Sequence, residues 1–292
     1  MLTTPKAARP VALAAALALT LSGLGCKGGG GQVTATSAAH HADALVVLSA
    51  KDVDEVARGL PEGAKRLSVL YAKGADPSKD LTYVHNLLAK VRRDVVDLSN
   101  SKATFFALAD EHGVGIRNDL EIDLMAGQNL GQIFPDLAKA EAGGYVETVG
   151  TFPGSATKAG PDKDWVAATA VTRDDGSVGG IFVTGWSYRL FARHLFEALK
   201  KNIFTEAAAN KTPENDIPIF YVALFDSSGI YSAPLTPEVD DEAMKKLDLV
   251  AKTASGPFQV LMDITGRSFG VAAARAPRLG ADTGIVVLRS EI

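Results

Sequence analysis

Two stretches of the chain share one pattern, although they are far apart in the sequence. "ALADEHGVGI" begins at Ala107 and "ALFDSSGIYS" begins at Ala223, 116 residues later. Both contain an apolar run, an Asp, two polar residues, a Gly and a β-branched residue, which indicates a strand, a tight turn and a second strand. At such turns an Asp side chain normally accepts a hydrogen bond from the backbone two residues on, so Asp110 and Asp226 are expected to have structural roles. A repeated hairpin predicts a repeated unit of structure.

The order of the elements around the two hairpins is repeated as well. After the first hairpin come a helix at "FPDLAKAEAGG" and three strands at "GYVETVG", "DWVAATAVTR" and "SVGGIFVTGW", with a hairpin turn at "RDDGS". An amphipathic helix, "SYRLFARHLFEALKKNI", then leads to the second hairpin, a helix at "TPEVDDEAM" and three more strands. The sequence therefore predicts an α+β fold with two tandem blocks, residues 101–208 and 209–292. Each is expected to be a mostly antiparallel sheet covered by helices.

Residues 42–100 are predicted to form a helical region before the first block. One helix is expected from Ala42 to Leu60, a short one after Pro61, and a long one opening at Asp76. Apolar residues in this last helix are spaced 3, 4, 3, 4 and 3 apart, at Leu81, Val84, Leu88, Val91, Val95 and Leu98. Because this seam covers only about two and a half heptads, it is consistent with packing inside the chain and with a homodimer.

The first 25 residues have the pattern of a secretory signal. A basic stretch, "TTPKAARP", precedes the apolar run "VALAAALALTLSGLG" and the only cysteine, Cys26. This junction resembles the lipobox of bacterial lipoproteins. The resemblance implies cleavage before Cys26, lipidation of its thiol, and a protein exported to the cell envelope and anchored on the periplasmic or outer-membrane side. Residues 26–41, rich in Gly, Ser, Thr and Ala, are then expected to be a flexible tether.

Composition narrows the range of functions. The chain is 47% hydrophobic and 22% charged, as in ordinary globular proteins. Removing Lys6 and Arg9 with the signal leaves 28 Lys and Arg against 34 Asp and Glu, a formal charge of about −6, so nucleic acid is not an expected partner. The sequence has none of the common hydrolase, nucleotide-binding or dinucleotide-binding motifs, and its five histidines do not have metal-ligand spacing. We therefore expect no enzyme activity, no metal and no cofactor.

A long helix followed by two blocks, each with an Asp-x-x-Gly turn in its hairpin and a three-stranded meander, resembles the double Cache sensor domains of the PAS-like superfamily. The resemblance covers residues 77 to 292 and depends on "FALADEHGVGIRND" and "FYVALFDSSGIYS". It implies a ligand, often an amino acid, a carboxylate or an amine, held between the sheet and its cover, usually in the first block. It also implies that a lipid-anchored member signals through a partner protein. The Arg, Trp, Tyr and Asp set of amino-acid-binding members is not reproduced, because Trp165 has no Arg before it.

Two groups of residues are candidates for ligand binding. Arg117 and Asn118 follow the hairpin strand, and Asp164 and Trp165 open a strand of the meander. Together these residues offer a fork for a carboxylate, an amide, an acceptor for an amine and a flat apolar wall. The alternatives are a surface pair of Arg117 with Asp119 or Glu121, and a core position for Trp165.

The second group lies where the last strand of the meander meets the connecting helix. Thr184, Trp186 and Tyr188 are expected either to line a ligand cleft or to seal the contact between the two blocks, with Ser187 capping the helix. The Gly- and Pro-rich stretch "FPGSATKAGPDKD" is expected to be a lid or a surface loop.

The function that these observations favour is a lipid-anchored, extracytoplasmic sensor that binds a small polar molecule and signals through a partner. The alternative is an envelope scaffold that has the fold but no ligand pocket, and a third reading is an undetected hydrolase. A packed core at Trp165 together with an exposed apolar patch would favour the scaffold. A hydrated cavity containing Arg117 and Trp165 would favour the sensor, and clustered acids with shifted pKa in a cleft would favour the hydrolase.

Overall fold

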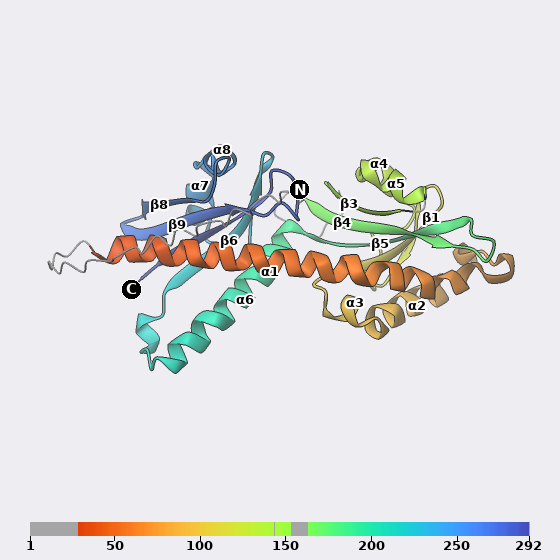
Figure 1. Ribbon diagram of the computed structural model, residues 1–292, viewed down its shortest axis with the longest axis horizontal. Helices are drawn as coiled ribbons and strands as arrows, with labels where there is room; N and C mark the ends of the chain where they lie inside the picture. Colours follow the sequence, from red (N-terminus) through yellow and green to blue (C-terminus); the bar gives the residue numbers. More distant parts are fainter. Residues whose placement is uncertain (1–28, 143, 153–162, 292) are drawn as a thin grey trace, which may run out of the picture.

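The computed structural model describes residues 29–142, 144–152 and 163–291, and shows two antiparallel sheets arranged one after the other along a single long helix (Figure 1). In the first sheet the strand order is β2-β1-β5-β4-β3, and in the second it is β7-β6-β10-β9-β8. The two orders are the same when the strands are counted from each hairpin, which confirms the predicted repeat. The strands are β1 (Phe105–Asp110), β2 (Gly115–Asn118), β3 (Tyr145–Gly150), β4 (Asp164–Thr172), β5 (Val178–Ser187), β6 (Ile219–Asp226), β7 (Gly229–Ser232), β8 (Phe258–Ile264), β9 (Arg267–Arg275) and β10 (Gly284–Ser290).

The two hairpin turns are built in the same way. Asp110 Oδ1 accepts hydrogen bonds from the backbone N–H groups of His112, at 2.9 Å, and Val114, at 2.8 Å. Asp226 Oδ1 accepts from the N–H groups of Ser228 and Gly229. The structural role predicted for the two aspartates is confirmed.

The long helix of the structure is α1 (Gly29–Leu67), which runs along both sheets (Figure 1). This corrects two predictions, because residues 29–41 of the expected tether are helical and the helix continues through Pro61. The early turns are not solvated. Ala35, Ala38 and Ala42 are buried, and a Cβ atom at Gly270 of β9 would lie only 2.5 Å from the backbone of α1. A face of small residues therefore packs closely on the second sheet.

The helix expected from Asp76 is instead divided into shorter pieces. These are η1 (Ser68–Gly74), η2 (Pro77–Lys79), α2 (Leu81–Asp94) and α3 (Val96–Asn100). Five members of the 3-4 seam are buried inside the chain, whereas Leu81 is exposed. A Cβ atom at Gly59 or Gly63 of α1 would approach Leu98 to 3.0 Å or less, so α1 and the seam are in close contact. The seam is thus covered by the protein itself, and a homodimer stays a prediction.

The connecting helix α6 (Tyr188–Ala209) leads from the first sheet to the second. The backbone N–H of Leu190 donates to Ser187 Oγ, which confirms the predicted cap. Smaller helices cover the sheet faces turned away from α1 (Figure 1). In the first block these are α4 (Leu130–Ile133), η3 (Pro135–Leu137) and α5 (Ala138–Glu141); η4 (Glu214–Asp216) precedes the second sheet, and α7 (Glu238–Lys245) and α8 (Leu249–Lys252) cover it.

The first sheet separates two cores. Phe106 and Leu108 of β1 belong to a large core shared with α1, α2 and α6. The alternate residues Phe105 and Ala107 belong to a smaller core beneath α4 and α5. Successive side chains of a strand point to opposite faces, so each residue of the first sheet can be assigned to one core or the other.

Candidate functional site

A cavity of about 170 Å³ lies at one end of the first sheet, on the side of the smaller core. Its floor is formed where β1 and β4 begin and where β2 and β5 end, so four strands contribute to it. The wall is completed by the segment that follows β2. The lining residues are Thr104, Phe105, Asn118, Leu120, Ile122, Leu124, Met125, Phe152, Asp164, Ser187 and Leu190.

Asn118 brings an amide group to the cavity. Its Oδ1 accepts a hydrogen bond from the N–H of Leu120 at 2.9 Å, and its backbone carbonyl lies 3.1 Å from Nδ1 of His85. No hydrogen bond among the described residues uses Nδ2 of Asn118. The side chain is buried and held in place while its two amide hydrogens are available to a bound molecule.

Asp164 and Ser187 face each other in the β4–β5 ladder and are both buried. Asp164 Oδ2 accepts a hydrogen bond from the N–H of Phe152 at 3.3 Å, and a carboxylate has about four lone-pair sites. Ser187 Oγ accepts from Leu190 and has one further lone pair and its own proton. This end of the cavity can therefore accept hydrogen bonds and attract positive charge.

Two acids hold the wall segment after β2. Asp119 accepts from the N–H of Phe106 at 2.7 Å and forms an ion pair with Arg92 of α2 at 2.8 Å. Asp123 accepts from the N–H groups of Asn118 and Met125. The two acids therefore fold an irregular segment and orient it over the sheet.

Arg117 lies outside the cavity lining. Its Nη1 is 3.0 Å from Oδ2 of Asp123, and both side chains are largely buried. The expected surface pair with Asp119 or Glu121 is thus replaced by a pair with Asp123. Through Asp123, Arg117 supports the segment that forms the cavity wall. This geometry does not place Arg117 where it would contact a ligand in the cavity.

Trp165 and Trp186 are in the other core, so the structure does not bring them to Asn118. Their rings stack at 4.3 Å between centroids, and Trp186 stacks on Phe191 of α6 at 4.5 Å. Trp165 also borders a groove of about 380 Å³ between the blocks, beside Arg278. A core position was the alternative given above for Trp165, and the structure places its side chain there.

Thr184 and Tyr188 also make structural contacts. The hydroxyl of Thr184 donates to the carbonyl of Phe105 at 2.6 Å within the sheet. The hydroxyl of Tyr188 donates to the carbonyl of Leu279 at 2.8 Å and lies 3.1 Å from that of Thr283, and burial raises the pKa of this phenol. Tyr188 therefore joins the first block to the second.

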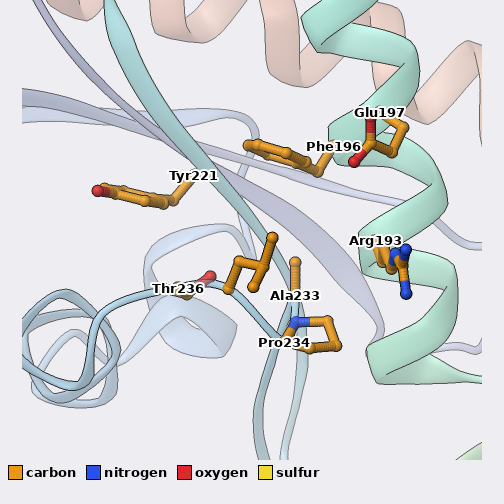
Figure 2. Close-up of a pocket in the computed structure, with 8 residues that line it drawn as sticks. Arg193, Phe196, Glu197, Tyr221, Ala233, Pro234 and Thr236 are labelled. Carbon is orange, nitrogen blue, oxygen red and sulfur yellow. The ribbon is translucent and has the colours of Figure 1, made fainter.

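The second block has only a small hollow near the equivalent place. Its volume is about 30 Å³, and it lies between α6 and the segment that follows β7 (Figure 2). Tyr221 is in the lining, five residues before Asp226, as Phe105 is five residues before Asp110. Arg193, Phe196 and Glu197 of α6 close the other side. The first block therefore offers more room for a small molecule at this place than the second does.

Sequence reasoning identified Asn118 and Asp164 but missed most of the apolar lining. Leu120, Ile122 and Leu124 alternate with acids in "DLEIDLM", and this alternation was an available signal for a half-exposed apolar wall. Residues 153–162, which make up most of the stretch 152–164 expected as a lid or a loop, lie outside the described residues, as does Cys26.

Comparison with solved structures shows the same architecture in sensory proteins. A domain of a sensory box/GGDEF family protein from Vibrio parahaemolyticus aligns with a TM-score of 0.55 and 13% identity, covering 89% of this chain and 97% of that one. The extracellular domain of a protein described as a histidine kinase, vpHK1S-Z8, aligns at 0.55 and 12%, covering 89% and 92%. That of a second such protein, rpHK1S-Z16, aligns at 0.51 and 13%, covering 88% and 94%.

The chain has an α+β fold of the double Cache-like type, shared with these domains. At these identities the likeness shows the fold alone, and no family model and no curated protein matches the sequence. The cavity described above lies in the first of the two blocks, which is where the sequence resemblance led us to expect the ligand.

Over residues 29–142, 144–152 and 163–291, no helix is long and apolar enough to cross a membrane. The same part of the chain has no group of three His, Cys, Asp or Glu side chains that could hold a metal ion.

Proposed function

We propose that this protein is a lipid-anchored, extracytoplasmic sensor that binds a small molecule in the cavity of the first block and signals through a partner protein. The observation that carries the proposal is the cavity itself, an apolar hollow with an amide, a carboxylate and a hydroxyl at Asn118, Asp164 and Ser187. Ligand sites of soluble proteins have this composition, since apolar walls supply affinity and a few fixed polar groups supply orientation.

The solved structures support the sensory part of the proposal. Two of the three aligned proteins are extracellular domains of proteins described as histidine kinases, and the third belongs to a sensory family. The lipid anchor is supported by the signal-like first 25 residues and by Cys26. Labelling cells with a tagged fatty acid tests it: we expect label on the protein, and none in Cys26→Ser.

The contacts between the blocks suggest how binding reaches the second block. Asp164 and Ser187 line the cavity, and their chain neighbours Lys163 and Tyr188 contact the second block. Lys163 forms an ion pair with Asp226 in the second hairpin turn. A shift of either strand end on binding would therefore move a contact with the second block, and α1, which packs on both sheets, would report the change to a partner.

Thermal unfolding of the purified full chain against amino acids, carboxylates, amines and purines tests the proposal. A ligand at 100 times its dissociation constant stabilises the folded state by about 2.7 kcal/mol. Leu124→Trp would fill the cavity mouth and should abolish the shift, whereas the control Leu235→Trp, at the small hollow of the second block, should retain it. A shift that is retained in Leu124→Trp would place the ligand elsewhere.

A scaffold function is the second candidate, and a specific observation favours it. Trp165 is packed in a core, and Leu120, Ile122 and Leu124 are exposed large apolar side chains on one segment, which could contact another protein. If no compound of the panel stabilises the chain, and crosslinking in cells through position 122 captures a protein, the scaffold replaces the sensor.

A further inference from the structure

The longest edge strand of the two sheets is β8, at the outer side of the second sheet. It has seven residues, against six in β3 and four in each of the other two edge strands, β2 and β7. An edge strand offers unpaired backbone N–H and C=O groups to a further strand, and proteins usually block it with a proline, a bulge or several charges. β8, "FQVLMDI", has no proline, one charged residue and an unbroken register with β9.

The turn after β8 determines which backbone groups point outward. Residues 265–266 form the turn with positive φ angles of 53° and 79°, as in the two-residue type I′ turns that close hairpins. The flanking residues Ile264 and Arg267 are therefore a hydrogen-bonded pair, and such pairs alternate with non-hydrogen-bonded pairs along an antiparallel ladder. The residues whose N–H and C=O groups point away from β9 are consequently Gln259, Leu261 and Asp263. No hydrogen bond elsewhere in the described part of the chain engages these groups.

The side chains of the same three residues are exposed, and Leu261 is 46% exposed. They lie on the face of the sheet that α1 covers, since Leu261 is opposite Gly270 and Gly270 contacts α1. The helix therefore leaves this outer strand largely uncovered. On the other face, Phe258, Val260 and Met262 are only partly buried against the core beneath α7 and α8.

The sequence of β8 is complementary to itself when two copies run antiparallel about Leu261. Leu261 then faces the same residue of the second copy, and Gln259 faces Asp263, so the one charged residue of the strand meets an amide instead of a like charge. Asp263 Oδ1 accepts a hydrogen bond from the N–H of Gly266 at 2.9 Å, which leaves Oδ2 for the amide of Gln259. Each of these facing pairs can exchange two backbone hydrogen bonds.

The same register brings apolar residues together on the other face. Val260 comes opposite Met262 of the second copy, and Phe258 comes opposite Ile264, so partly buried side chains would lose contact with water. No other antiparallel register pairs all three outward-pointing residues of one copy with those of the other. The backbone groups, the charges and the apolar side chains therefore favour one arrangement.

We propose that two copies of this protein associate through β8, which joins their second sheets into one antiparallel sheet with a two-fold axis at Leu261. A two-fold contact of this kind uses the same surface on both copies and closes on itself. The inference goes beyond the proposed function and does not depend on the ligand cavity. The apolar seam of α2 and α3, which the chain itself covers, takes no part in it.

Sedimentation equilibrium of the purified full chain at increasing concentration tests the proposal. We expect a mass that rises towards twice that of one chain. Leu261→Lys places like charges at the axis and should raise the dissociation constant of the dimer roughly tenfold. Gln259→Asp should raise it about three- to tenfold, because two carboxylates then face each other at each Asp263, whereas Gln259→Lys should lower it by about the same factor. A gain in Gln259→Lys cannot come from misfolding.

Oxidative crosslinking tests the register. In a Cys26→Ser background, Leu261→Cys should form a crosslinked dimer, because the Cα atoms of a hydrogen-bonded pair are about 5.5 Å apart, within the range of a disulfide. Gln259→Cys in the same background is the matched control and should stay uncrosslinked, since each Gln259 is opposite Asp263, about 13 Å along the strand from its own copy.

A second control tests whether an added charge alone changes the mass. Leu235→Lys should form dimers like the wild type, because Leu235 is 77% exposed and follows β7, the opposite edge strand of the sheet. The mass of a single chain at every concentration would overturn the proposal. So would a dimer that is equally stable in the wild type, Leu261→Lys and Gln259→Asp, because it would use another surface.

Discussion

The ion pair between Lys163 and Asp226 gives the sharpest stability prediction. The side chain of Asp226 is fully buried, and that of Lys163 is 16% exposed. Removing one member of a buried pair leaves a buried charge without its partner, which typically costs about 3–5 kcal/mol. Asp226 Oδ1 would still accept from Ser228, Gly229 and the hydroxyl of Tyr231, at 3.3 Å, so the lower end of that range applies.

We therefore expect Lys163→Met to reduce the free energy of unfolding by about 3 kcal/mol, which lowers the unfolding temperature by roughly 6–10 °C in a domain of this size. Asp226→Asn should lose less, about 1–2 kcal/mol, because it retains an acceptor for the turn and Lys163 can reach water. The double variant should lose less than the sum of the two, since both changes remove the same interaction.

The assay is urea unfolding of the wild type, Lys163→Met, Asp226→Asn and the double variant, followed by circular dichroism. Arg58→Met is the control, because Arg58 and Asp97 form an ion pair in which the side chains are 57% and 37% exposed, and its loss should cost less than about 1 kcal/mol. A loss in Lys163→Met no larger than that of the control, or strict additivity in the double variant, would refute the argument that this pair is desolvated.

Three further predictions concern the contacts that join the parts of the fold. Tyr188→Phe removes the hydrogen bond to the carbonyl of Leu279 and should lower the free energy of unfolding by about 1–2 kcal/mol in urea unfolding; an unchanged free energy would contradict this role. Gly270→Ala would place a Cβ atom 2.5 Å from the backbone of α1, so hydrogen exchange should become faster in residues 34–42; unchanged protection would contradict the close packing. Burial and the nearby Arg289 lower the pKa of His41 to about 4, below its unfolded value of 6.5. Between about pH 6.5 and 4 the unfolded chain then binds more protons than the folded one, so the wild type should lose stability as the pH falls through this range. His41→Gln should lose less stability over the same range, as measured by urea midpoints.

The repeat shows how much the sequence alone could predict. The hairpin turns depend on Asp110 and Asp226, whose side chains bond the backbone nearby, and strand alternation depends on neighbouring residues. Because such signals are local, the two blocks, their strands and the α+β class followed from the sequence. The same reasoning identified Asn118 and Asp164, which come at strand ends.

The N-terminal helix was misjudged for a physical reason. Residues 29–41 contain Gly, Ser, Thr and Ala and have no large apolar face, so nothing local indicates that they fold. Their helix is stabilised by close packing on β9, which depends on Gly270, more than 200 residues away. No window of the sequence includes both partners.

Local chemistry therefore determined the elements, their order and the polar residues at the strand ends. Tertiary structure alone decided which of those residues share a cavity. Arg117, Trp165, Thr184, Trp186 and Tyr188 have side chains suited to binding, but ion pairing with Asp123, ring stacking and hydrogen bonds within and between the blocks engage them. A side chain can serve a ligand only where its neighbours leave space beside it, and those neighbours come from distant parts of the chain.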